Sequence, residues 1–495
     1  YVHQYGLRAR VVSISKINTS FTEKTRRYRV VIIDESHNLR NRQAKRYAWV
    51  KEYIEKNESR VILLTATPYN KNYLDISNQL RLFLPEDKDI GISPERFVES
   101  VGGAIEFVAK YQYLPNTLLA FEKSDFSEDW QELLKTYMVR RTRTFIKSNY
   151  AIWDEDRKQH YIPFNDGSIN YFPERVPKKV QYRFDEKDPS DVYVKLYSTE
   201  VVDKINSLHL ARYGLGNYLD PNSDLKPTKE EERIMANLSQ AGKRLMGFCR
   251  TNLFKRLESS GFSFLVSLAR HVSRNYLFLY AMENGLPFPI GQQESADMDE
   301  FLEEDDSGGE YKLALLTDKD KYRQLAEEHY ERCQIEKNKF DWISSRQFMP
   351  ELARWLQEDA DAILSIIEIG KYWNPKEDRQ LNALEKLLTK THKYEKVLVF
   401  TQFADTARYL EEQLSSRGIK DLGCVTGAVE NPTEYAYRFS PISNRVKDMY
   451  DEIRILISTD VLSEGQNLQD AHIIVNYDLP WALIRLIQRA GRVDR

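Results

Sequence analysis

The sequence predicts an α/β protein in which two parallel-sheet lobes flank a mainly helical insertion. Residues 1–85 and 381–495 each alternate short apolar runs of strand length with amphipathic helical stretches, a rhythm typical of parallel sheets covered by helices. Residues 151–375 contain few strand-like runs and several apolar patterns of helical period. We therefore expect an incomplete first lobe over residues 1–150, a helical insertion over 151–375 and a second lobe over 376–495.

Length and composition define the class of protein. At about 100–200 residues per domain, a chain of 495 residues holds about two to four domains. The chain is 41% hydrophobic and 30% charged, which indicates a globular protein and excludes a disordered or fibrous one. The net charge of -3 excludes a histone-like polycation, but it permits a local basic patch.

The spacing of the cysteines and the length of the apolar runs indicate the cellular compartment. Cys249, Cys333 and Cys424 lie far apart and form no C-x-x-C pair, so we expect neither a disulfide framework nor a zinc ribbon, and a reducing compartment is favoured. No run of about 18 apolar residues occurs, and no signal-peptide pattern opens the chain. These observations predict a cytoplasmic protein that does not cross a membrane.

The strands and helices of both lobes are predicted from apolar runs and their spacing. In the first lobe, the expected strands span 10–14, 30–33 and 61–64, with a helix over 43–57. In the second lobe, the expected strands span 396–400, 422–425, 453–457 and 472–475, with helices over 404–416 and 481–490.

The insertion shows helical signals and one acidic segment. Thr228 is followed three residues later by Glu231, a capping-box pattern that predicts the start of a helix. From Phe262 to Leu279, apolar residues recur at helical spacing, which indicates a core helix. Residues 294–306 hold eight acidic residues and are expected to form a solvated segment.

Two carboxylates end the second expected strand of the first lobe, in Val30-Val-Ile-Ile-Asp34-Glu35-Ser36-His37. The carboxyl end of a parallel strand is where α/β sheets bind ligands. An Asp there can hold a hydrated magnesium ion on a nucleotide, and the neighbouring Glu can orient an attacking water. The alternative is that Asp34 only caps the following helix.

Two hydroxyl residues, Thr65 and Thr67, follow the next expected strand and precede Pro68. Small hydroxyl side chains at this position can connect a phosphate site to a substrate groove through hydrogen bonds. The alternative is an ordinary strand exit, because Thr is favoured in strands.

The end of the sequence carries Gln488, Arg492 and Arg495 at positions i, i+4 and i+7, which share one face if the segment is helical. Two guanidinium groups on one edge suit the equatorial oxygens of a transferring phosphoryl group. The alternative is a solvated basic helix face, although Gly491 beside it favours close backbone approach.

Taken together, these segments resemble superfamily 2 helicases, and within them the Swi/Snf-like DNA translocases. Asp34-Glu35-Ser36-His37 is similar to motif II, and Leu64-Thr65-Ala66-Thr67-Pro68 to motif III. The other matching segments are Tyr137 to Arg143 (the exit from the first lobe), Val397 to Phe403 (motif IV), Ile457 to Asp460 with Ser463 to Leu468 (motif V), and Gln488 to Arg495 (motif VI). Six segments in the family's order cover roughly residues 10–145 and 380–495. Arg40 stands where the family usually has Lys.

The resemblance implies two RecA-like lobes with ATP and Mg²⁺ between them, and it implies a role for each matching residue. Asp34 would hold Mg²⁺ through water, Glu35 would position the hydrolytic water, and Arg492 and Arg495 would reach the γ-phosphate. The implied nucleotide-binding residues are Gln488, Gly465 and Asn467, the implied coupling residues are His37, Thr65 and Thr67, and the implied nucleic-acid contacts are Thr401, Gln402, Ser458 and Thr459. Such phosphate contacts position a strand without reading its bases.

Charge gives modest support to a nucleic-acid partner, most simply double-stranded DNA. Arg250, Lys255 and Arg256 lie in an acid-free stretch of the insertion, where the Swi/Snf-like family carries helical protrusions that touch duplex DNA. The alternative is a solvated helix face.

One departure from the family is that no G-x-x-x-x-G-K-[ST] loop occurs in these residues. The simplest interpretation is that these residues are a fragment of a longer chain. The fragment would lack the upstream and downstream parts and would not hydrolyse ATP alone. The alternative is a helicase-derived scaffold that binds DNA or protein and hydrolyses nothing. The long insertion resembles that of bacterial helicases from restriction or defence systems. The motifs do not distinguish a motor that separates strands from one that only translocates along DNA.

Overall fold

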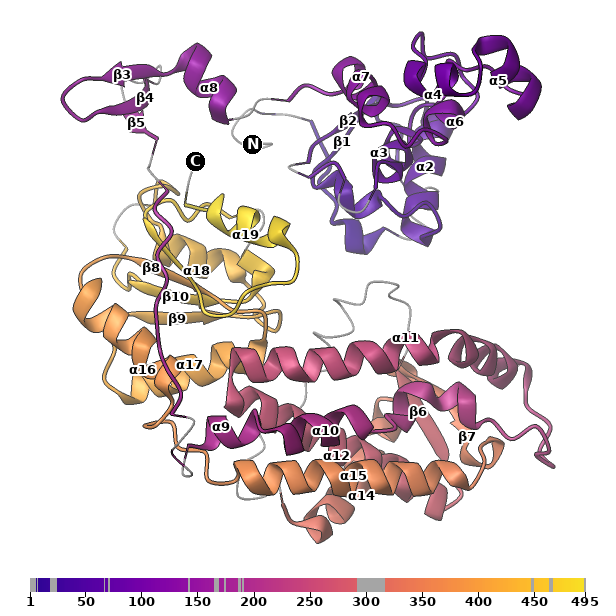
Figure 1. The fold of residues 1–495 in the computed structure, drawn as a ribbon, viewed down its shortest axis with the longest axis vertical. Helices are drawn as coiled ribbons and strands as arrows, with labels where there is room; N and C mark the ends of the chain where they lie inside the picture. The colour runs from indigo at the N-terminus through magenta and orange to yellow at the C-terminus, as the bar shows by residue number, and fades with distance from the viewer. Residues whose placement is uncertain are drawn as a thin grey trace. The chain divides into compact units, whose positions relative to one another are not determined.

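A computed structural model describes residues 6, 8–17, 25–65, 67–69, 72–140, 143–163, 169–172, 175–185, 188, 191–291, 317–446, 449–462 and 466–493. The chain divides into two compact units, residues 1–170 and 171–495, and each is described by itself (Figure 1). The acidic segment predicted over 294–306 lies outside the described residues.

The first unit contains a parallel pair of strands, β1 (Val30–Ile33) and β2 (Arg60–Leu63), joined by helix α2 (Lys45–Asn57). One face of this pair packs on α2, with Ile33 and Ile54 in a shared buried cluster. The opposite face carries Val30, Ile32, Ile62 and Leu64, which are 46–62% exposed. The predicted 30–33 strand and 43–57 helix are confirmed to within two residues.

The strand predicted over 10–14 is wrong. Residues 10–13 are irregular, and Ile14–Lys16 form a short 3-10 helix, η1. Ile14 and Ile17 pack against the β1–β2 cluster instead of pairing with it. An apolar run becomes a strand only when a neighbouring strand offers hydrogen-bond partners, and a short run cannot reveal whether one is present.

The rest of the first unit is mainly helical. It contains α3 (Leu74–Leu80), α4 (Glu95–Ser100), α5 (Ala104–Tyr111), α6 (Leu118–Phe121), α7 (Ser127–Tyr137) and α8 (Arg143–Tyr150). Strands β3 (Ile152–Asp154), β4 (Gln159–Pro163) and β5 (Ile169–Tyr171) form a small sheet after α8. Trp130 of α7 and Phe121 of α6 centre a second buried cluster.

The second lobe is a parallel sheet in the order β11-β8-β10-β9. Its strands are β8 (Val397–Phe400), β9 (Leu422–Val425), β10 (Ile455–Ser458) and β11 (Ile473–Asn476), and its helices are α16 (Arg379–Lys386), α17 (Ala404–Ser416), α18 (Pro432–Phe439) and α19 (Leu483–Ala490). Val397 and Val399 pack toward α17, whereas Leu398 and Phe400 pack toward α18. Both faces of the sheet are thus buried under helices, which confirms the prediction of a parallel sheet covered on both sides.

From residue 191 to residue 370 the chain is mainly helical, with one hairpin, whereas residues 152–163 of the predicted insertion form strands and belong to the first unit. The helices of the insertion are α9 (Val192–Leu196), α10 (Thr199–Ser207), α11 (Lys229–Ser259), α12 (Gly261–Glu283), α14 (Lys319–Ile335) and α15 (Glu351–Gly370), and β6 (Pro287–Gly291) pairs antiparallel with β7 (Phe340–Ser344). Helix α12 is buried along most of its length. The capping box at Thr228 and Glu231 is confirmed.

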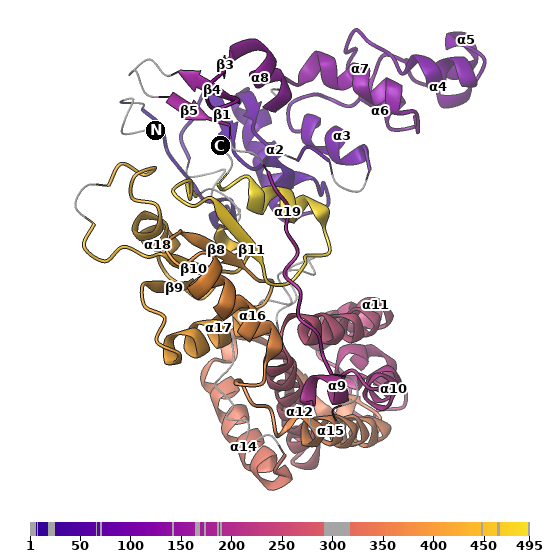
Figure 2. The same ribbon diagram turned by 60° about the vertical axis from the view of Figure 1, so that its left-hand side comes forward.

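Two local features lie where the insertion meets the second lobe, near the hydrogen bond from Trp373 Nε1 to the Tyr409 hydroxyl at 3.4 Å. The joint between α11 and α12 needs a glycine, because a Cβ at Gly261 would lie 2.3 Å from the Trp373 ring. An extended connecting segment, residues 175–185, runs beside the second lobe to α9 (Figure 2). The Arg379 side chain of α16 holds this segment by donating to the Arg183 carbonyl at 2.6 Å.

Among the described helices, none has the length and apolarity needed to cross a membrane.

Candidate functional site

Asp34 is the first residue after β1 and is exposed. Its Oδ1 accepts the Glu35 backbone N–H at 3.0 Å. The following turn, η2 (Ser36–Leu39), has Glu35 at its N-cap and no side-chain cap, so the alternative that Asp34 caps that helix is wrong. The carboxylate therefore stands at the carboxyl end of a parallel strand, where a ligand can reach it.

Glu35 has a left-handed backbone, with φ +48°. Such a conformation is costly for a residue with a side chain and is often found at functional sites. Its carboxylate Oε2 lies 3.2 Å from Nδ1 of the buried His37. The turn thus places a half-buried carboxylate beside the exposed one.

The predicted coupling residues are brought together at the ends of β1 and β2. His37 Nδ1 lies 3.2 Å from Thr65 Oγ1, and Thr65 Oγ1 accepts the Thr67 backbone N–H at 3.0 Å. Leu64, which follows β2, also accepts the Ser36 N–H at 2.9 Å. These hydrogen bonds join the ends of the two strands.

Gln79 of α3 holds two turns of this site together, a role that sequence reasoning missed. Its Oε1 accepts from Ser36 Oγ at 2.8 Å, and its Nε2 donates to the Pro68 carbonyl at 2.6 Å. It ties the turn after β1 to the turn after β2. No local pattern in α3 distinguishes this glutamine from a surface one.

In the second lobe, three of the four predicted nucleic-acid contacts are buried. Thr401 and Ser458 are 0% exposed and Thr459 is 5% exposed. Thr401 Oγ1 donates to the Asp478 carboxylate, while Ser458 Oγ donates to the Thr459 carbonyl at 2.6 Å. Gln402 is half-buried, and its Nε2 donates to the Leu479 carbonyl at 2.7 Å. Only Gln402 has a side chain that reaches the surface.

Asp478, just after β11, is a second residue that the sequence did not reveal. Its carboxylate accepts the Gln402 backbone N–H at 2.9 Å and the Ser259 hydroxyl at 2.6 Å. Burial raises its pKa, although the hydrogen bonds from Ser259 and Thr401 oppose the shift. It organises the turn after β8 and connects that turn to the insertion.

Helix α19 ends at Ala490, so Arg492 lies in the following turn and not on the helix with Gln488. This corrects the prediction of one continuous helical face. Arg492 is 5% exposed, and its Nη1 donates to the Gln466 carbonyl at 3.3 Å. Gly465 and Arg495 lie outside the described residues.

Asn467 and Arg489 hold two segments near Arg492, namely the segment that contains Gln466 and helix α19. Asn467 Nδ2 donates to the Ser443 carbonyl at 3.0 Å. Arg489, which sequence reasoning passed over, is fully buried and donates to Asp460 at 2.6 Å. Its guanidinium also lies 5.1 Å from the centre of the Phe400 ring. The buried Arg489 fixes α19 on the sheet.

The three basic residues of α11 that were predicted to contact nucleic acid, Arg250, Lys255 and Arg256, lie in three different environments. Arg250 donates to the Leu208 carbonyl and is half-buried. Lys255 pairs with Glu258 at 2.5 Å and lies over the Trp481 ring at 5.3 Å. For Arg256 the structure differs from our prediction of a nucleic-acid contact, because the side chain is 2% exposed and pairs with Asp405 at 3.3 Å.

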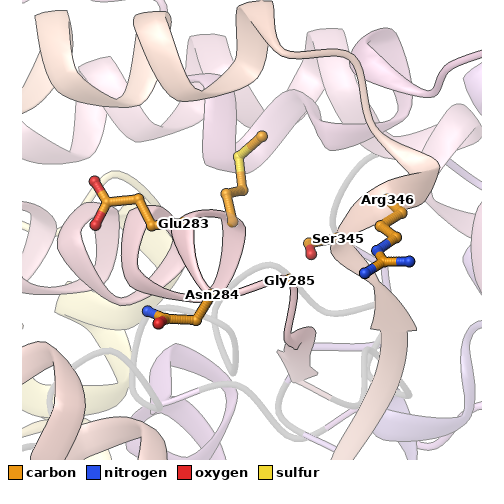
Figure 3. A pocket seen from close by; sticks show the side chains of 6 residues that line it. Glu283, Asn284, Gly285, Ser345 and Arg346 are labelled. Carbon is orange, nitrogen blue, oxygen red and sulfur yellow. The ribbon is translucent and has the colours of Figure 1, made fainter.

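A cavity of about 440 Å³ lies at the far end of α12, where Gly285 turns the chain toward β6. Glu283 and Asn284 lie on one side of it and Ser345 and Arg346 on the other (Figure 3). It contains none of the predicted site residues. Within the described part of the chain, no group of three His, Cys, Asp or Glu side chains could hold a metal ion.

Comparisons with known proteins agree with the motif order. Residues 11–211 match the family model of the SNF2-related domain, and residues 379–495 match that of the helicase conserved C-terminal domain. Together these matches cover more than half of the chain.

Individual relatives match over shorter segments. The chain is 34% identical over 102 residues to an uncharacterized ATP-dependent helicase, YqhH, of Bacillus subtilis, covering 20% of this chain and 16% of that protein. It is 31% identical over 134 residues to DEAD-box ATP-dependent RNA helicase 35A of Oryza sativa, covering 27% and 20%. The matched segment thus spans a fifth or less of the length of these two relatives.

Among solved structures, the Sulfolobus solfataricus SWI2/SNF2 ATPase core in complex with dsDNA is 13% identical, with a TM-score of 0.22. The comparison covers 93% of this chain and 59% of that one.

Proposed function

We propose that this chain, which belongs to the Swi/Snf-like family of superfamily 2 helicases, is the motor part of an ATP-dependent DNA translocase or helicase. The observation that carries the proposal is the 3.2 Å contact between His37 and Thr65. It joins the turn bearing Asp34 and Glu35 to the end of the neighbouring strand, so that phosphate chemistry at one turn can move the other.

The residues of the first unit fit a magnesium nucleotide. Asp34 offers an exposed carboxylate oxygen, the type of ligand that Mg²⁺ prefers. When bound, Mg²⁺ would neutralise phosphate charge. Asp34 would hold it through water, and Glu35 would orient the attacking water.

The second lobe supplies the remaining nucleotide contacts in this proposal. Arg492 and Arg495 would reach the γ-phosphate when ATP is bound, and Gln488, Gly465 and Asn467 would hold the nucleotide. Arg492 is already positioned by the carbonyl of Gln466. A guanidinium group suits phosphate oxygens, because its planar N–H groups can donate two parallel hydrogen bonds to them.

We further propose that double-stranded DNA lies along the second lobe near Gln402. Gln402, Lys255 and Arg250 would contact the DNA, whereas the buried Thr401, Ser458 and Thr459 would shape the loops that carry the contacts. A restriction, defence or DNA-repair system is the proposed setting.

The test of catalysis is the ATPase rate of the intact protein that carries these residues. Glu35→Gln should lower kcat by about 10²-fold or more, because a water-orienting carboxylate contributes that much, with little change in the KM for ATP. Glu58→Gln is a matched control, since Glu58 also has a left-handed backbone, φ +50°, but lies at the end of α2. It should leave kcat unchanged.

The nucleic-acid partner is tested by measuring the same ATPase rate with duplex DNA, single-stranded DNA and RNA. Duplex DNA should stimulate most. If no nucleic acid stimulates the intact protein and Glu35→Gln changes nothing, the chain is instead a non-catalytic scaffold.

A further inference from the structure

A second cavity, of about 280 Å³, lies within the unit of residues 171–495, where the connecting segment, the insertion and the second lobe meet. Its lining includes Tyr182 and Phe184 of the connecting segment, Tyr197 after α9, Lys255 of α11, and Gln402 and Tyr477 of the second lobe. Three regions that are distant in sequence therefore build one site.

Aromatic rings form one wall of this cavity. Phe184 lies 4.7 Å from Tyr193 and 6.1 Å from Tyr197, measured between ring centres. Tyr182 and Tyr197 are 38% and 42% exposed, so their rings are accessible from solvent. Exposed rings at a cavity stack well on flat aromatic ligands.

A buried hydroxyl beside the cavity has no protein partner. Tyr477 is only 9% exposed, and among the described residues no group hydrogen-bonds to its hydroxyl. A buried polar atom without a partner is costly, so such groups are normally satisfied by protein, water or a ligand. This hydroxyl favours an occupant with polar atoms at its edge.

Charged groups complete the site. Lys255 and Glu258 both line it and pair with each other at 2.5 Å. Lys255 also lies over Trp481, which is 63% exposed. A purely apolar occupant would leave the Tyr477 hydroxyl unmatched, whereas a nucleobase offers a stacking face together with donors and acceptors at its edge.

We propose that this cavity binds a single unpaired nucleobase from nucleic acid held along the second lobe, an inference that rests on the proposed function. The volume supports one ring system, since it falls just below the roughly 300–1,000 Å³ typical of pockets for larger ligands. Gln402 lines the cavity, and its backbone N–H is held by Asp478, which lines it too. A base here would therefore adjoin the strand that Gln402 contacts.

The test uses the 495-residue chain and a DNA duplex carrying 2-aminopurine as a one-nucleotide bulge, with the fully paired duplex as reference. The bulged duplex should bind about 10-fold more tightly, as expected for one stacked base, and the 2-aminopurine fluorescence should fall on binding. Replacing both Tyr182 and Tyr197 with Ala should abolish the preference and the quenching, while the affinity for paired duplex stays within about twofold.

Single variants separate stacking from hydrogen bonding and from misfolding. Tyr197→Phe keeps the ring and should keep the preference. Tyr477→Phe removes only the unpartnered hydroxyl and should reduce the preference severalfold. Tyr372→Ala is the matched control, because Tyr372 is 70% exposed and does not line the cavity; it should change nothing.

The outcomes distinguish this inference from the proposed function. If paired duplex binds and stimulates the intact protein, but the bulged duplex binds no better and shows no quenching, the nucleobase site is wrong and the motor proposal stands. If the chain binds neither duplex, both are overturned.

Discussion

Single buried residues determine how this protein responds to pH. His271 of α12 is 6% exposed and lies near the Tyr213 ring. Burial lowers its pKa well below the ordinary value of 6.5, and the positive charges of Arg212, Arg274 and Arg256 lower it further. The folded protein therefore holds this imidazole neutral, whereas the unfolded chain takes up a proton below about pH 6.5.

We expect the contribution of His271 to the stability of the second unit to fall as the pH drops from 7.5 to 5.5, because at this residue the unfolded chain binds a proton that the folded protein does not. His271→Gln should remove about 1 kcal/mol of that pH dependence, measured by urea unfolding at both pH values. His472→Gln, at an exposed position, should leave it unchanged. An identical pH slope in His271→Gln and the unmodified chain would contradict this account.

At the scale of elements, one carboxylate joins the insertion to the second lobe. Asp405 of α17 is 6% exposed and accepts hydrogen bonds from Arg270 at 2.8 Å and Arg256 at 3.3 Å. Nearby, Thr406 lies 2.8 Å from the hydroxyls of both Ser259 and Ser263. Helices α11 and α12 are thus attached to α17 by buried polar groups.

Asp405→Asn should destabilise the second unit by about 3–5 kcal/mol, because it removes the buried negative charge with which the guanidinium groups of Arg256 and Arg270 pair. Denaturant unfolding measures the loss. The control is Asp361→Asn, which breaks the half-exposed pair with Lys319 and should cost at most about 1 kcal/mol. Similar small losses in both variants would show that the cluster contributes little.

The elements that sequence predicted best are those whose signal is local. Strand β8 is a run of four buried apolar residues, and its limits were predicted to within one residue. The predicted strand at 10–14 failed because strand pairing depends on a distant neighbour. Asp34 and Glu35 were recognisable from their position after a strand. Asp478 was not, because its role depends on Ser259, 219 residues away in sequence.

At the scale of the whole molecule, the two units have separate hydrophobic cores. Each also has its own buried carboxylate that organises nearby loops. In the first unit, Asp129 of α7 is 4% exposed and accepts the backbone N–H groups of Arg96 and Phe97 at 2.9 and 3.2 Å. Asp405 is its counterpart in the second unit.

Scanning calorimetry of the full chain should therefore show two unfolding transitions. Asp129→Asn should lower the midpoint of one transition, because it weakens the hydrogen bonds from the backbone amides of Arg96 and Phe97 to a buried side chain. Asp405→Asn should lower only the other. A single transition that both variants shift equally would mean that the chain unfolds as one cooperative block.

The hydrogen bond between Ser259 and Asp478 has a practical consequence for protein engineering. The insertion cannot be excised as a removable cassette by joining residue 191 to residue 376. Such a deletion would take away Ser259, Arg256 and Arg270 together, so the buried carboxylates of Asp478 and Asp405 would lose these hydrogen-bond donors. A shortened version of this protein must retain the joint between α11 and α12, where Ser259 lies, however much of the far ends of these helices is removed.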